Sequence, residues 1–263
     1  MKVGIITASL PMDTKAALKK AKDMGAHGVQ LWVVNNDLDP ENLSTSGRQD
    51  LITYMDSLSL ERSALCGDIG GFANPATVDE QVARTKTMFD LCVDLRTPIL
   101  TTHIGMVPED HGSPAYRDMV TAVREVAEYA ANRDCCFATE TGLESGEGLA
   151  AFLKDVDSHG AQVNFDPANL CMMGFDHLAD LRALAKWVVH THAKDGIQNS
   201  AREGGHQEVP LGKGDVDFPT YLAVLREIGY DGYLTIEREC GDDPVADIAE
   251  AIQFLKSQEG VER

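Results

Sequence analysis

Four short hydrophobic stretches of this sequence each end in a side chain that can bind a metal ion: Glu140, Asp166, His192 and Glu237. Glu140 and Asp166 are 26 residues apart, and so are Asp166 and His192. The interval from His192 to Glu237 is 45 residues. In a large α/β fold, a strand and the helix after it occupy roughly 31 residues. The spacing therefore indicates that successive strands bring the four side chains to one place, the last after a longer loop.

The residue types in this pattern define the chemistry. Two glutamates, an aspartate and a histidine offer oxygen and nitrogen ligands, which suit Mn²⁺, Mg²⁺, Co²⁺ or Zn²⁺. Because side chains alternate across a strand, each of the four shares its face with the residue two positions earlier: Ala138, Asn164, His190 and Thr235. A structural ion pair explains any one strand-end acid as well as a ligand does. The four side chains together favour a metal site.

Composition and charge exclude several classes of protein. The chain has 263 residues, 43% hydrophobic and 25% charged, as in an ordinary soluble protein. No run approaches the roughly 20 apolar residues of a membrane helix, and the first residues show no signal-peptide pattern, so we expect a cytoplasmic protein without a membrane partner. The six cysteines lack CxxC spacing, which favours reduced, mostly buried thiols. The formal charge of −19 disfavours nucleic acid as a partner.

Short β-like runs alternate with amphipathic helical runs along the whole chain, without a low-complexity linker. We therefore expect one domain, residues 1–263. The predicted strands are 3–7, 29–32, 62–66, 98–103, 135–141, 162–166, 187–193 and 233–237. The predicted helices cover about 14–24, 47–58, 77–95, 114–133, 148–158, 178–186, 218–228 and 244–256. Thr77 and Glu80 predict a capping box at the start of the third helix.

Eight strand–helix units predict a (β/α)₈ TIM barrel of the α/β class, although a doubly wound open sheet shows the same alternation. An open sheet concentrates its site at one switch point. Here the polar strand ends are spread over the fourth to the eighth strand. This spread favours the barrel.

Further polar and aromatic residues near strand ends are candidates for substrate binding. His103 is either a substrate contact or second metal ligand, or a hydrogen-bonded core histidine. Lys194 either pairs with an anionic intermediate or with a neighbouring carboxylate, and Glu239 either contacts substrate or is solvated. Trp32 either stacks on a sugar face or packs in the core. His190 lies one layer deeper than His192, where orientation of a ligand or ordinary packing is expected rather than direct ligation.

Three motifs make a family resemblance specific: HTHAKD at 190–195, LGKGDVDF at 211–218 and GYDGYLTIE at 229–237. Together with the ordered ligand set, they resemble the xylose isomerase-like TIM-barrel superfamily of sugar isomerases and epimerases. The resemblance to its ketose 3-epimerase branch implies that the four ligands bind one divalent cation, most often Mn²⁺, and that both glutamates exchange protons with substrate. Where those epimerases carry a substrate-binding histidine, this chain has Asn169, a candidate substrate contact. Such barrels commonly form homo-oligomers.

The expected reaction is isomerisation or epimerisation of a sugar or keto-sugar, phosphorylated or not. A proton next to a carbonyl is too weakly acidic for an unaided carboxylate, so a cation must polarise the carbonyl and stabilise the enediolate. Glu140 and Glu237 would be the acid and base. Two alternatives stay open: a metal-dependent endonuclease-like hydrolase, which needs more ligands and a basic surface, and a non-catalytic sugar-binding barrel.

Overall fold

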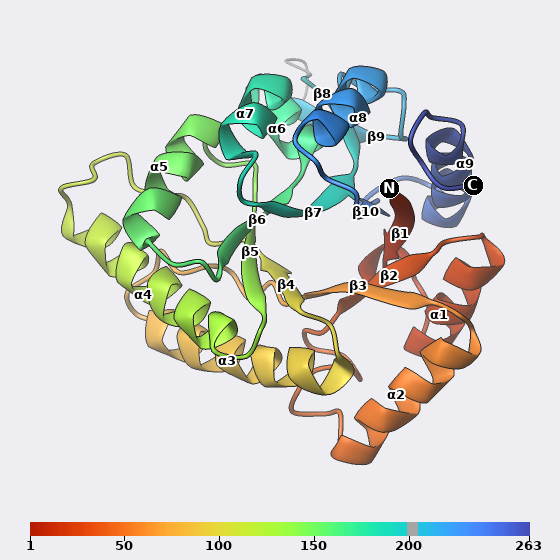
Figure 1. Ribbon diagram of the computed structural model, residues 1–263, viewed down its shortest axis with the longest axis horizontal. Coiled ribbons are helices and arrows are strands. Elements are labelled where there is room, and N and C mark those ends of the chain that lie inside the picture. Colours follow the sequence, from red (N-terminus) through yellow and green to blue (C-terminus); the bar gives the residue numbers. More distant parts are fainter. Residues whose placement is uncertain (199–204) are drawn as a thin grey trace.

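The computed structural model describes residues 1–198 and 205–263, in which eight parallel strands close into a single barrel (Figure 1). The barrel strands are β1 (Lys2–Ile6), β2 (Gly28–Trp32), β3 (Glu61–Cys66), β4 (Ile99–Thr102), β5 (Cys136–Glu140), β6 (Ala161–Phe165), β7 (Val188–Ala193) and β10 (Tyr233–Ile236). Neighbouring strands follow chain order around the ring, and β1 pairs with both β2 and β10. The predicted TIM barrel is confirmed.

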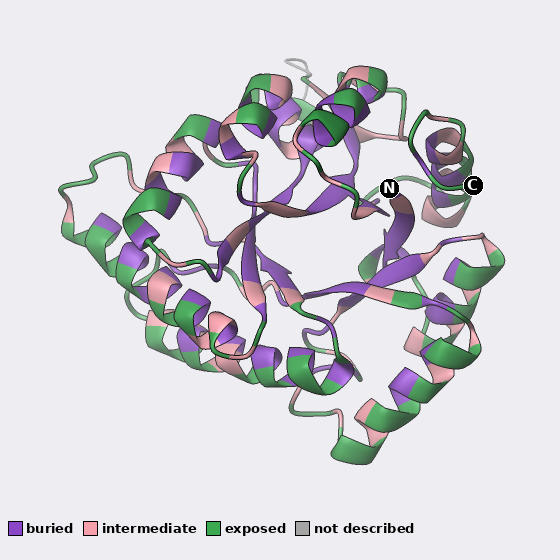
Figure 2. Cartoon of the chain, viewed as in Figure 1, coloured by how far each residue is buried: buried purple, intermediate pink, exposed green. Residues whose placement is uncertain are grey.

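Helices between the strands form the outer ring (Figure 1). They are α1 (Thr14–Asp23), α2 (Thr45–Ser57), α3 (Val78–Leu95), α4 (Pro114–Ala131), α5 (Gly146–Val156), α7 (His177–Leu184), α8 (Phe218–Glu227) and α9 (Pro244–Lys256). Several begin at capping side chains that the sequence shows, such as Asp13, Ser113 and Asp217. Figure 2 shows their exposed outer faces and buried inner faces, as the helical spacing of apolar residues requires. None of the described helices has the length and hydropathy for crossing a membrane.

The structure differs from the sequence prediction in short elements at the strand ends. A 3₁₀ turn, η1 (Thr7–Ser9), follows β1, and a short helix, α6 (Pro167–Met173), follows β6. The long loop after β7 contains an antiparallel hairpin of β8 (Asp195–Gln198) and β9 (His206–Val209). These pieces contain only three to seven residues each, too few to show a hydrophobic period.

The predicted capping box at the start of α3 is wrong. Thr77 is the N-cap residue, but its side chain makes no capping hydrogen bond, and its backbone lies at φ −124° and ψ −9° rather than in the extended region. The Thr77 hydroxyl instead donates to Oε1 of Gln81, 3.2 Å away. Thus Thr77 and Glu80 do not satisfy each other's backbone donors.

Two different layers pack on the strands. Apolar side chains fill the space between the strands and the helices, whereas the inside of the barrel carries a buried polar layer. This layer is made of side chains no more than 1% exposed: Gln30, Thr101, Asn164, His190 and Thr235. Buried polar groups are stable only when hydrogen-bonded, so this layer forms a network rather than a set of isolated contacts. It forms the floor of the site described next.

Candidate metal centre

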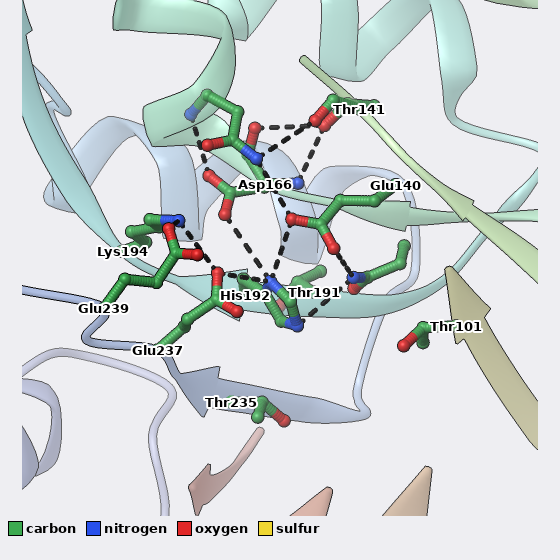
Figure 3. A network of polar contacts seen from close by, with 12 residues as sticks. Thr101, Glu140, Thr141, Asp166, Thr191, His192, Lys194, Thr235, Glu237 and Glu239 are labelled. Carbon is green, nitrogen blue, oxygen red and sulfur yellow. Dashed lines mark hydrogen bonds and ion pairs between the residues drawn. The ribbon is translucent and has the colours of Figure 1, made fainter. Parts of the chain in front are cut away.

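The four predicted ligands meet at the carboxyl-terminal mouth of the barrel (Figure 3). Glu140 is the last residue of β5, His192 lies near the end of β7, and Glu237 directly follows β10. Asp166 follows β6 and is the N-cap of α6, so its position is fixed from both sides. One ligand atom from each of the four residues lies within 4.8 Å of the others. Parallel strands explain this convergence, because their carboxyl ends share one rim.

Three carboxylates surround one nitrogen, Nδ1 of His192 (Figure 3). It lies 3.3 Å from Glu140 Oε1, 3.5 Å from Asp166 Oδ2 and 3.2 Å from Glu237 Oε2. Both Nδ1 of His192 and Oδ2 of Asp166 are buried without a hydrogen-bond partner. Unpartnered buried polar atoms are costly, and a bound cation satisfies them. The donor set therefore fits a divalent metal ion.

The charges of the cluster point to the same conclusion. Burial alone would lower the pKa of His192, but the carboxylates of Glu140 and Glu237 raise it well above its usual value. Burial alone would raise the pKa of Glu237, yet His192 and Lys194 lower it. Several buried negative charges thus favour a positive charge among them, which a divalent cation supplies more strongly than a proton.

Gln30 fixes the orientation of the His192 ring from the far side of the barrel. Nε2 of His192 lies 2.9 Å from Oε1 of Gln30, and the Gln30 amide donates to the Thr101 hydroxyl at 2.6 Å. With its hydrogen on Nε2, His192 would direct the lone pair of Nδ1 at a cation that takes the place of the Nδ1 proton, and this is the tautomer that a metal ligand needs. The contact of Nε2 with Asn164 Nδ2, at 3.2 Å, joins two donors in this tautomer and adds no hydrogen bond. Sequence reasoning missed Gln30; its signal was an amide within an otherwise apolar strand.

A second set of hydrogen bonds supports Glu140 from below. His190 Nδ1 lies 2.8 Å from Oδ1 of Asn164, and the Thr235 hydroxyl lies 3.0 Å from His190 Nε2. Burial lowers the pKa of His190 well below its usual value, so the ring is neutral and donates from Nδ1. The Asn164 amide is thereby oriented with Nδ2 donating to Glu140 Oε2 at 3.2 Å. His190 therefore orients a ligand, one of the two roles expected from its position.

Asn169 and His103 contact Glu140 on its other oxygen, Oε1. Asn169 Nδ2 donates to it at 3.0 Å, and His103 Nε2 lies 3.8 Å from it. Gly142 makes room for Asn169, because a Cβ at Gly142 would lie 2.8 Å from the Asn169 Cβ. His103 Nδ1 lies 3.0 Å from Asp68 Oδ2, and Glu140 is the main cause that raises the pKa of His103 to about 9. Sequence reasoning missed Asp68, which lies in a glycine-rich loop.

Lys194 and Glu239 lie together beside Glu237 (Figure 3). The Lys194 ammonium is 3% exposed, lies 3.0 Å from Glu237 Oε2 and also contacts the Glu239 carboxylate. Glu208 of β9 lies 4.0 Å from it and pairs with Arg238. Lys194 thus pairs with neighbouring carboxylates, one of the two readings that the sequence left open. Sequence reasoning gave no sign of Glu208, because the hairpin that carries it was not predicted.

Trp32 lies at the end of β2 in a different hollow. Its indole donates to the Val34 carbonyl at 2.9 Å, and the ring lines a surface depression with Pro11, Met12 and Asn36. Trp32 therefore lines a different hollow from the one that His103 and Asn169 line. Its role as a sugar-stacking residue stays a prediction.

Comparison with known proteins agrees with this architecture. A family model described as xylose isomerase-like TIM barrel matches residues 18–258. The chain belongs to this family. A xylose isomerase domain protein from Planctomyces limnophilus has a similar structure, with a TM-score of 0.85, 29% identity, and coverage of 97% of this chain and 95% of that one. A D-psicose 3-epimerase structure, at 16% identity and a TM-score of 0.76, covers 99% of this chain and 100% of that one, and shows the same fold.

Curated relatives match this chain over part of their length. An uncharacterized protein of Methanocaldococcus jannaschii is 25% identical over 187 residues, which is 63% of this chain and 61% of that protein. The L-ribulose-5-phosphate 3-epimerase UlaE of Salmonella paratyphi C is 33% identical over 146 residues, 55% of this chain and 46% of the epimerase. The chain thus spans about half to three fifths of the length of these relatives. The epimerase activity that the name UlaE states is that of the relative.

Proposed function

We propose that this protein is a divalent-metal-dependent sugar or keto-sugar isomerase or epimerase that works by proton transfer through an enediolate. The observation that carries the proposal is the meeting of two glutamates, the buried Glu140 and the partly buried Glu237, with His192 and Asp166 at the mouth of the barrel. Membership of the xylose isomerase-like family supports it. The curated UlaE relatives, which are named as sugar-phosphate epimerases, support it as well.

Glu140, Asp166, His192 and Glu237 would hold one cation, with Mn²⁺ expected and Mg²⁺, Co²⁺ or Zn²⁺ as alternatives. When bound, the cation supplies Lewis-acid polarisation of a substrate carbonyl. Gln30 keeps the His192 lone pair directed at the cluster, and Asn164 and Asn169 each hold one oxygen of Glu140. These contacts organise the site before substrate arrives, which lowers the cost of reaching the reactive geometry.

The two glutamates would transfer the protons. Lys194 lowers the pKa of Glu237, together with His192, and so keeps Glu237 an ionised base near neutral pH. Glu140 accepts hydrogen bonds on both oxygens, which fixes its carboxylate plane relative to bound substrate. One glutamate would remove a proton from the carbon next to the carbonyl and the other would return one. General acid–base catalysis of this kind contributes roughly 10²- to 10⁴-fold.

Substrate contacts are proposed for His103, Asn169, Lys194, Glu239 and Trp32. His103 and Asn169 lie beside Glu140 and line a common hollow, so they are placed to bind sugar hydroxyls. Lys194 and Glu239 flank Glu237 on its other side. We also expect a homo-oligomer, as in many barrels of this family. Light scattering at micromolar concentration checks this, and a species of 28.5 kDa alone would count against it.

The deciding experiment is turnover of a panel of keto-sugars in D₂O by wild type, Glu140→Gln and Glu237→Gln. Gln keeps an oxygen ligand but removes the base, so activity should fall by at least about 10²-fold while metal content, measured in each variant, changes far less. Deuterium should enter the reacting carbon in the wild-type reaction. Near-normal turnover by both variants would refute two-base catalysis.

Three further outcomes separate the alternative mechanisms and functions. Product without deuterium would favour a hydride shift over proton transfer and would not contradict the proposed metal site. Metal-dependent sugar binding without any turnover would favour a non-catalytic barrel. Salt-sensitive binding of abasic DNA would favour the endonuclease-like hydrolase, although the charge of −19 makes a phosphate backbone an unfavourable partner.

A further inference from the structure

A hollow of about 220 Å³ lies beside Glu140 at the barrel mouth. Its polar lining consists of His206 and of His103 and Asn169, both of which contact Glu140 Oε1. Its apolar lining consists of Leu143, Met172 and Met173. A substrate bound at the four ligands would therefore extend past the polar pair into an apolar space. From this arrangement we propose, on the basis of the proposed function, that the substrate is an unphosphorylated keto-sugar with an apolar substituent at its far end.

The solvent exposure of the apolar side chains that line the hollow favours an apolar ligand. Leu143 is 41% exposed and Met173 47%, so two large apolar side chains face water at one hollow. Clustered exposed apolar side chains mark binding surfaces, because covering them removes unfavourable contact with water. Methionine is flexible and polarisable and adapts to flat rings. Since a cavity of about 150 Å³ holds a benzene molecule, this hollow is large enough for a six-membered ring.

The charges near the hollow disfavour a phosphate. None of the described residues that line it is lysine or arginine. Two cations described near the candidate ligands are already paired: Lys194 with Glu237 and Glu239, and Arg238 with Glu208 and Asp247. A phosphate carries nearly two negative charges and needs charged donors to replace its hydration.

His206 and His103 are the other basic residues that line the hollow, and the charge of His103 is compensated. His103 lies between Asp68 and Glu140, at 3.0 Å and 3.8 Å, so its charge is shared with two carboxylates. A phosphate beside it would meet those carboxylates as well. This chain should therefore differ from its UlaE relatives, which are named for a sugar phosphate.

The test uses ketohexoses that differ only at carbon 6, as the free hydroxyl, the phosphate ester and the benzyl ether, for D-fructose and D-tagatose. Calorimetry with the Mn²⁺-loaded protein measures each dissociation constant. The benzyl ether should bind at least about tenfold more tightly than the free sugar, because it buries apolar surface, and the phosphate should bind more weakly than either. Equal or tighter binding of the phosphate, no gain from the benzyl group, or no binding of any probe would overturn the inference.

Matched variants localise the effect. Met173→Lys places a cation in the hollow and should narrow the gap between benzyl ether and phosphate by about tenfold or more. Val93→Lys is the control, since Val93 is equally exposed, at 47%, but lies on α3. It should leave all three affinities unchanged. If the difference in affinity between benzyl ether and phosphate is the same in Met173→Lys as in wild type, the benzyl group binds outside the hollow and the proposal is wrong.

The result is separable from the test of the proposed function. If ketoses exchange hydrogen with D₂O but the phosphates bind best, the substrate inference fails and the proposed reaction stands. If the benzyl ethers bind best and Met173→Lys removes their advantage, the hollow is confirmed even when no ketose exchanges hydrogen. In that case only the proposed chemistry fails.

Discussion

Oε1 of Gln30 lies 2.9 Å from Nε2 of His192, although 162 residues separate them in the chain. The contact spans the barrel from β2 to β7 and selects the His192 tautomer that leaves Nδ1 free for a metal ion. It also links the metal centre to β4, through the hydrogen bond from Gln30 to Thr101. A residue that touches no ligand atom of the cluster thus controls one of its four members.

This contact yields a test of metal affinity. Gln30→Met keeps the side-chain length but removes the acceptor of the His192 hydrogen bond, so metal affinity should fall by about 10- to 100-fold. Titration against a chelator of known affinity measures the change. Gln162→Met is the control, because Gln162 donates only to the nearby His159 carbonyl. Unchanged affinity in Gln30→Met would show that the Nε2 contact does not select the tautomer.

The four candidate ligands should determine both the metal content of the protein and the thermal stability that bound metal adds. Purified protein should contain about one divalent ion per chain, and both Asp166→Ala and His192→Ala should lose it. Chelation of wild type should lower its melting temperature, since metal at a hundredfold excess over its dissociation constant adds about 2.7 kcal/mol. Elemental analysis and thermal unfolding provide the readouts, with His159→Ala, an exposed histidine, as the control. Full metal content in both ligand variants would contradict the site.

Asp195 should be a major determinant of stability in the loop after β7. Its carboxylate accepts four backbone N–H groups: those of Gly196 and Val216 on Oδ1, and those of Gly212 and Gly214 on Oδ2. Asp195→Asn replaces one oxygen by an amide that cannot accept, which leaves two donors without a partner. The free energy of unfolding should fall by roughly 2–4 kcal/mol in urea titrations.

Two further variants test whether the loss of stability comes from the hydrogen bonds of Asp195. Gly214→Ala should act in the same direction, because a Cβ at Gly214 would lie 2.1 Å from Asp195 Oδ1. Asp242→Asn removes an exposed carboxylate and should change stability by less than about 0.5 kcal/mol. Equal stability of Asp195→Asn and wild type would mean that the loop does not depend on this carboxylate.

A buried histidine outside the site predicts a pH dependence. Burial lowers the pKa of His177, whose Nδ1 lies 3.1 Å from the Cys171 thiol, and burial raises the pKa of that thiol to about 12. The thiol is thus protonated and donates to an unprotonated ring. In the unfolded chain His177 binds a proton below a pH of about 6.5. The unfolded state then holds more protons, so stability falls as the pH drops below about 6.5.

The slope from one such group approaches about 1.4 kcal/mol per pH unit. Urea unfolding of metal-free protein at pH 7.5, 6.5 and 5.5 measures it. His177→Gln should flatten the dependence, whereas His159→Gln, at an exposed position, should not. Parallel curves for wild type and His177→Gln would assign the acid sensitivity to other groups.

The barrel and the convergence of the four candidate ligands could be predicted from sequence because both rest on short-range patterns. Strand–helix alternation sets the fold, and the rim position of Glu140, Asp166, His192 and Glu237 follows from their place at strand ends. Homology then supplied the family. The alternation and the strand-end positions can each be recognised within single segments of the sequence.

The rest of the site depends on contacts that no single segment encodes. Gln30 reaches the site from β2, and Asp68 reaches it from the loop after β3, two segments that showed no metal-ligand pattern. Glu208 depends on a hairpin of four-residue strands, too short for a recognisable period. The sequence allowed two roles for Lys194. Its pairing with Glu237 and Glu239 depends on β7 and β10 being neighbours in the barrel, which the sequence of neither strand shows.

The pairing of β1 with β10 brings the two ends of the barrel's sequence together, with Ile5 opposite Ile236. Glu237 follows directly on that seam, and its backbone N–H donates to the Ala193 carbonyl at 3.3 Å. During synthesis or refolding, three ligands are available before the fourth strand end arrives. On the proposed function, high-affinity metal capture would therefore be a late event that coincides with ring closure, and its kinetics would report a long-range step of folding.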